Sequence, residues 1–128
     1  MDPAEMKQRT RQFSLRVIRL VESLPGTTTG SVIGRQLLRS ATSVGANYRS
    51  ALRAKSKADF MMKLKIVVEE ADESLYWMEL LSEAEIIPAS RLTDLMNECD
   101  QLIAIVVTTI KNTRRNQQTE TKVNHDQS

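Results

Sequence analysis

Hydrophobic residues along this chain recur every three or four positions, a spacing that places them on one face of an α-helix. The pattern predicts four helices in succession. In the first, Leu24-Pro25-Gly26 ends the helix, and residues 27–30 form a loop. Its apolar face is Met6, Phe13, Val17, Leu20 and Leu24. The second helix is predicted from about residue 31 to 55. Its apolar face is Leu37, Ala41, Val44, Tyr48 and Ala51.

The third and fourth predicted helices each begin at a serine. Ser56 caps the third, with Asp59 three residues later near the positive end of the helix dipole. Ile86-Ile87-Pro88 ends this helix, and Ser90 caps the fourth. The apolar face of the third helix is Phe60, Leu64, Val67, Ala71, Leu75 and Met78. That of the fourth is Leu92, Leu95, Met96, Cys99, Leu102, Ile103, Val106 and Ile110.

These elements predict an all-α fold, an up-down-up-down antiparallel four-helix bundle in one domain of residues 1–111. From residue 112 onward Val123 is the only large apolar residue, so residues 112–128 are expected to be a disordered polar tail. The polar N-terminus does not resemble a signal peptide, and no apolar run reaches the length of a membrane span. A single cysteine fits a reducing compartment, and we expect a cytoplasmic protein.

The third helix carries a second apolar face, opposite the one assigned to the core. Because an apolar surface rimmed by polar groups is typical of protein interfaces, this face predicts a homo-oligomer. On the first helix, Leu15 and Ile18 also point away from the core, and they fit ordinary exposed residues equally well. The expected interface residues are Met62, Ile66, Glu70, Glu73, Trp77, Leu80, Leu15 and Ile18.

The distribution of charge adds a second feature, because basic and acidic residues are concentrated in different segments of the chain. Residues 7–65 hold thirteen Lys or Arg and two acids, whereas residues 69–100 hold ten acids and one base, Arg91. Blocks of this kind suit either a polyanion or the pairing of one subunit's basic face with another's acidic face.

Four arginines of the basic block lie on one side of the second helix, within about 80° of one another and over about 27 Å. Such a line suits a sugar-phosphate backbone, although a solvated surface or neutralisation by a partner's acids would explain it too. With few aromatic residues for stacking, binding would depend on phosphates rather than bases. The candidate nucleic-acid contacts are Arg35, Arg39, Arg49, Arg53, Lys55, Lys57, Lys63 and Lys65.

Catalytic chemistry is not expected. His125, the one histidine, lies in the tail, and Cys99 lies on a core face where a buried thiol is inert. A carboxylate di-iron site in a bundle needs a Glu-x-x-His pair on each of two helices. We therefore predict no enzyme activity, cofactor or metal, with a carboxylate metalloenzyme as a distant third hypothesis.

Residues 34–81 resemble a bacterial four-helix-bundle family that includes the ribosomal RNA intervening-sequence proteins. The matching segments are RSATSVGAN at 39–47, ADF at 58–60, KL at 63–64, EA at 70–71, Glu73 and YW at 76–77. Accessory variability determinant proteins of diversity-generating retroelements are more distant relatives. The family pattern positions carried over to this chain are Arg39, Asn47, Glu70, Glu73 and Trp77.

The resemblance implies a ring-like homopentamer, and its retroelement branch implies a reverse transcriptase and nucleic acid as partners. Our leading hypothesis is thus a non-enzymatic, homopentameric protein that binds RNA or DNA backbone, as a possible accessory of a reverse transcriptase. The alternative is a protein–protein scaffold without nucleic acid, in which the basic second helix docks on a neighbour's acidic third helix.

Overall fold

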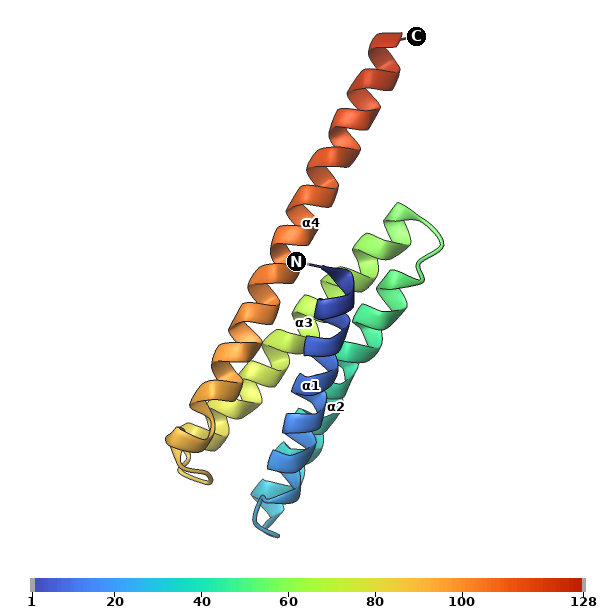
Figure 1. Ribbon diagram of the computed structural model, residues 1–128. Coiled ribbons are helices and arrows are strands. Elements are labelled where there is room, and N and C mark those ends of the chain that lie inside the picture. Colours follow the sequence, from blue (N-terminus) through green and yellow to red (C-terminus); the bar gives the residue numbers. More distant parts are fainter. Residues whose placement is uncertain (1, 128) are drawn as a thin grey trace.

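The computed structural model describes the backbone of residues 2–127 and the side chains of residues 2–122. Its elements are α1 (Pro3–Glu22), α2 (Thr28–Leu52), α3 (Lys57–Glu83), the 3₁₀ turn η1 (Ala89–Arg91) and α4 (Thr93–Gln127). Successive helices run in opposite directions (Figure 1). The described residues form four α-helices and no strand, which confirms the predicted all-α four-helix fold. None of these helices is long and apolar enough to cross a membrane.

The connection between α1 and α2 lies earlier in the chain than predicted, at residues 23–27. The Thr27 side chain accepts a hydrogen bond from the Gly30 amide at 3.1 Å, so α2 already begins at Thr28. The prediction that residues 27–30 form the loop was therefore wrong. A Cβ at Gly30 would collide with the Pro25 carbonyl oxygen, so this tight turn requires glycine.

One of the two predicted serine caps is confirmed. The Ser56 hydroxyl accepts a hydrogen bond from the Asp59 amide at 3.1 Å, at the start of α3. Ser90 does not cap α4, because it lies inside η1, where the Arg91 amide bonds the Pro88 carbonyl. This extra turn delays α4 to Thr93. Glu85 has a φ of 58°, in the left-handed region, where the chain turns away from α3.

Most of the predicted core residues are buried, but Leu24, Met96 and Ile103 are only half-buried, and the buried face of α3 differs from the predicted one. On α3, Phe60 and Leu75 are only half-buried, while their neighbours Met61 and Ser74 are buried. The Ser74 hydroxyl donates to the Ser40 hydroxyl of α2 at 2.9 Å, in a fully buried pair. Because this pair satisfies both polar groups, α3 can turn a serine toward α2. The other buried hydrophobic residues of α3 are Leu64, Val67, Ala71, Met78 and Leu81.

Helix α4 is the longest element and extends beyond the other three (Figure 1). Its last buried apolar residue is Ile110, next to the predicted end of the bundle at residue 111. The following residues differ from the expected disordered tail, since the backbone stays helical to Gln127. Intrahelical hydrogen bonds satisfy this backbone without packing. Lys57, at the start of α3, forms an ion pair with Glu120 of this extension.

Candidate nucleic-acid interface

Arg39, the central candidate on α2, is engaged by acids of its own chain. Its Nη1 donates to Glu70 Oε2 of α3 at 3.2 Å, and its Nη2 forms an ion pair with Glu73. The indole Nε1 of Trp77 also donates to Glu73, at 3.0 Å. Hydrogen bonds from Trp77 and Arg39 lower the pKa of Glu73 below its ordinary value. The charge of Arg39 is thus compensated before any partner arrives.

This network unites four of the five family pattern positions noted in the sequence. Arg39 comes from α2, whereas Glu70, Glu73 and Trp77 come from successive turns of α3. Asn47, the fifth, bonds within its own helix, where its amide donates to the Ser43 carbonyl at 2.9 Å. Four of the five positions therefore form one contact between α2 and α3 within a single subunit.

The expected oligomer surface is only partly exposed. Met62 is 56% exposed and Ile18 38%, whereas Ile66, Trp77, Leu80 and Leu15 are half-buried. Tyr76, which the sequence analysis did not select, is 53% exposed and packs edge-on against Trp77, with ring centroids 5.1 Å apart. It could have been found as the next aromatic residue on the outer side of α3. With Glu70 and Glu73 already paired, Met62 and Tyr76 are the principal apolar groups that this side offers.

Two of the candidate lysines also have acidic partners. Lys63 lies 3.1 Å from Asp59, one turn earlier on α3, and Lys57 pairs with Glu120. The bond from Lys63 is the main cause that lowers the pKa of Asp59. In the part of the chain with described side chains, the remaining candidates are exposed and form no ion pair. They are Arg35, Arg49, Arg53, Lys55 and Lys65.

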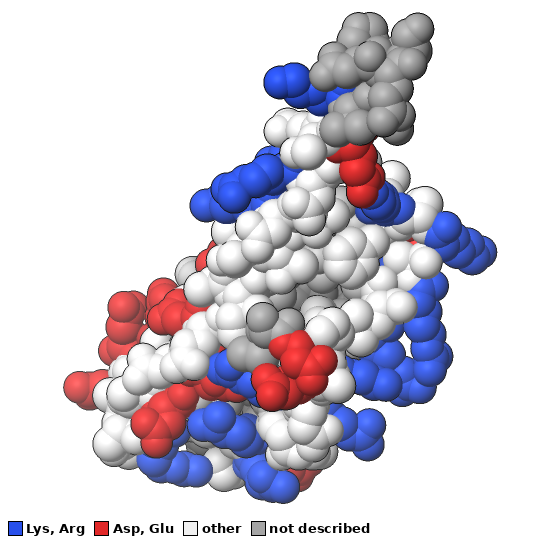
Figure 2. Space-filling model, turned by 45° about the horizontal axis from the view of Figure 1, so that its top comes forward, with Lys and Arg blue, Asp and Glu red and all other residues white. Residues whose placement is uncertain are grey.

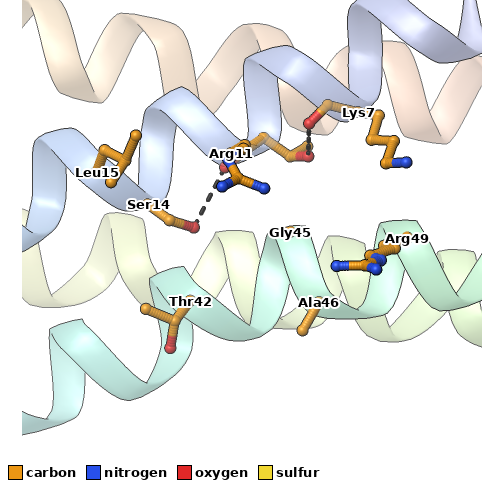
Figure 3. Close-up of a pocket in the computed structure, with 9 residues that line it drawn as sticks. Lys7, Arg11, Ser14, Leu15, Thr42, Gly45, Ala46 and Arg49 are labelled. Carbon is orange, nitrogen blue, oxygen red and sulfur yellow. Dashed lines mark hydrogen bonds between the residues drawn. The ribbon is translucent and has the colours of Figure 1, made fainter.

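A groove between α1 and α2 joins one of these free arginines to two cations of α1 (Figure 3). We call it the α1–α2 groove, and its volume is about 280 Å³. Its floor is open at Gly45, where an added Cβ would lie 3.4 Å from the Thr10 carbonyl oxygen. The groove is lined by Lys7, Thr10, Arg11, Ser14, Leu15, Thr42, Gly45, Ala46 and Arg49.

The charged residues of the α1–α2 groove are all basic. Lys7 and Arg11 lie one turn apart on α1, and Arg49 faces them from α2 (Figure 3). None of the three belongs to an ion pair among the described side chains. Ser14 donates to the Ala41 carbonyl at 3.1 Å, which ties the two helices together at the floor.

The sequence-based candidates did not include Lys7 and Arg11 of α1, or Arg9 on the same helix. Arg9 points toward α4, where its Nη2 bonds Glu98 at 2.5 Å and Gln101 at 2.9 Å. The spacing of Lys7, Arg11 and Leu15, each one turn apart, was the available signal. On the face shown in Figure 2, basic residues lie on the right, along the lower edge and at the upper left, while the largest group of acidic residues lies on the left.

Comparison with known proteins identifies a family and a similar solved structure. Residues 3–108 match a family model described as 23S rRNA-intervening sequence protein. The chain is also 35% identical to a protein with unknown function from the S23 ribosomal protein family of Bacteroides thetaiotaomicron VPI-5482, whose crystal structure superposes with a TM-score of 0.81. That alignment covers 87% of this chain and 99% of the other. No curated protein matches the chain.

Proposed function

The chain belongs to the 23S rRNA-intervening sequence protein family, and from that premise we propose that it is a non-enzymatic protein that binds the backbone of RNA or DNA. The observation that supports this most is the α1–α2 groove, which brings Lys7, Arg11 and Arg49 together without an acid. A guanidinium or ammonium group that lacks an acidic partner is available to a phosphate oxygen.

The basic surface continues from the groove toward the turn between α2 and α3. Arg53 lies one helical turn after Arg49, and Lys55 follows in the turn itself; both are exposed. Such a track suits successive phosphates of one strand. Tyr48 is buried, and Tyr76 and Trp77 belong to α3, so no aromatic side chain lines the groove for base stacking. Recognition would therefore depend weakly on sequence.

Self-association is the second part of the proposal. Exposed Met62 and Tyr76 on α3 are available to a neighbouring subunit in a ring of five. A ring would repeat the groove on each subunit, which raises the overall affinity for a long strand. The reverse transcriptase partner remains a prediction, tested by co-purification of the protein with its nucleic acid and protein partners.

The scaffold alternative has less support from the contacts. It requires the basic face of α2 to dock on a neighbour's acidic α3, yet Arg39 meets Glu70 and Glu73 within one chain. Docking would replace these ion pairs within one chain by equivalent ion pairs between chains. Such an exchange gains little net free energy at an exposed position.

Binding is tested with a fluorescent single-stranded RNA in an anisotropy titration. We expect Arg11→Gln plus Arg49→Gln to weaken binding by about tenfold or more, because two charge-assisted contacts are lost. The matched control is Arg35→Gln plus Lys65→Gln, which removes the same charge from exposed positions outside the groove. Equal affinity of the two double variants, or no binding by the wild type, would contradict the groove assignment.

A further inference from the structure

A second basic hollow lies on another side of α1, next to η1. We call it the arginine pocket, defined by Arg16, Arg19, Leu20, Arg91 and Leu95, and its volume is about 260 Å³. Arg16 follows Arg11 by five residues, which is a rotation of about 140° on the helix. The arginine pocket therefore lies on a different side of α1 from the α1–α2 groove, and the two share no lining residue.

Folding alone assembles this pocket. Arg91 is the one base in the acidic block of residues 69–100, and the 3₁₀ turn η1 places it beside two arginines more than seventy positions earlier. The Arg91 Nη2 donates to the Ser23 hydroxyl at 3.0 Å, and Ser23 in turn donates to the Leu20 carbonyl at 2.7 Å. Ser23 therefore fixes the guanidinium of Arg91 from the end of α1.

The three positive charges of the pocket lack acidic compensation. None of Arg16, Arg19 and Arg91 takes part in an ion pair among the described side chains. Its two other lining residues, Leu20 and Leu95, are 7% and 5% exposed, so they give the pocket an apolar floor. Like charges repel when they are brought together, and a bound anion would remove that repulsion.

We propose that the arginine pocket binds a phosphate monoester group. Guanidinium groups from two elements surround one small hollow, an arrangement that suits a compact dianion with several free oxygens. A phosphodiester within a strand offers a single negative charge and two free oxygens, and it fits the long groove instead. The 5′-terminal phosphate of a nucleic-acid strand and free inorganic phosphate share the required chemistry.

Binding of a 5′-terminal phosphate, which we call the strand-end form of the proposal, rests on the proposed function. Binding of free phosphate does not. The first arm titrates inorganic phosphate into ¹⁵N-labelled protein and follows the arginine side-chain resonances. We expect saturable shifts at the pocket arginines, stronger at pH 7.5 than at pH 5.5, because a larger fraction of the phosphate is the dianion at the higher pH. The shifts should disappear in Arg91→Gln and persist in Arg49→Gln.

The second arm compares 5′-phosphorylated and 5′-hydroxyl forms of one RNA. The phosphorylated strand should bind about tenfold more tightly, since it adds charge-assisted hydrogen bonds. Arg91→Gln or Arg19→Gln should abolish this gain but leave the affinity for the 5′-hydroxyl strand unchanged. Ser23→Ala should reduce the gain. Thermal melts of each variant show that the fold is intact.

The two arms separate the outcomes. Phosphate shifts without any RNA binding would support the pocket for free phosphate and overturn the proposed function. RNA binding with no preference for the 5′-phosphate would overturn the strand-end form. Absence of saturable shifts with inorganic phosphate, together with equal affinity for both strands, would overturn the pocket itself.

Discussion

At the scale of single residues, the availability of a charge depends on which side chains lie within reach. Arg39 and Arg49 lie on the same helix and looked equivalent in sequence, yet Arg39 meets two glutamates and Arg49 faces two cations. Cys99 shows the same dependence for a thiol, since burial is the main cause that raises its pKa to about 12. Its Sγ contacts the Ala71 carbonyl at 3.1 Å, as expected of a structural cysteine.

Glu73 gives a prediction about pH. Its pKa is lowered in the folded protein, so its contribution to stability is present above its ordinary value of 4.5 and is lost as the pH falls through the lower, folded value. We expect Glu73→Gln to destabilise the protein modestly at pH 7, because both partners are partly exposed. The difference from wild type should shrink as the pH falls below the ordinary value of 4.5 and through the lower folded value, where wild-type Glu73 becomes protonated.

Urea unfolding at pH 7, 4.5 and 3 measures this difference. The control is Glu69→Gln, an exposed glutamate of α3 that has no ion pair among the described side chains. A Glu73→Gln difference that stays constant over the three pH values would contradict the assigned ion pair.

At the scale of elements, capping and burial set where each helix begins and where it stops contributing to the bundle. Ser56 fixes the start of α3 by a side-chain bond to the Asp59 amide, and the same signal at Ser90 was overridden by η1. In α4 the helix continues beyond the last residue that packs in the core. The last buried residue is Ile110, but the helix continues to Gln127.

Removal of residues 112–128 tests the role of this extension. We expect the thermal midpoint of the bundle to change by about 2 °C or less, because the side chains described beyond Ile110 are exposed or half-buried and only Glu120 pairs with the bundle. Differential scanning calorimetry of the shortened and full chains measures it. The point variant Glu120→Gln controls for the Lys57–Glu120 pair. A fall of several degrees with the truncation alone would show that the extension packs on the protein.

At the scale of the whole molecule, most basic and acidic residues remain apart, and only a few of the described side chains form ion pairs between helices. The basic groove faces one side, and the arginine pocket adds a second basic site on another side of α1. The formal net charge is only +2, so any attraction for a polyanion must come from these local concentrations.

Salt dependence tests this view of the whole surface. With three groove cations on a single-stranded RNA, the logarithm of the binding constant should fall against the logarithm of salt concentration with a slope of about −2 per groove. In Arg11→Gln plus Arg49→Gln the slope should shrink to about −0.7, since one phosphate contact remains. Anisotropy titrations over a series of salt concentrations provide both slopes, and a flat response of the wild type would exclude binding through phosphates.

The sequence by itself determined the elements, the family and most core faces, because helical periodicity and caps are local signals. Leu64, Val67 and Met78 are buried as their spacing predicts, and Ser56 caps α3. It did not determine the rotation of α3, where buried Ser74 replaced Leu75 beside α2.

The tertiary structure alone decided which cations are free. Arg39 pairs with Glu70 31 positions away, and Arg9 with Glu98 89 positions away, whereas Lys7 and Arg49 meet across a groove with no acid. Arg91 likewise joins Arg16 and Arg19 only through the path of η1. Whether charges compensate one another depends on how helices distant in sequence are rotated and packed, and no local pattern carries that information.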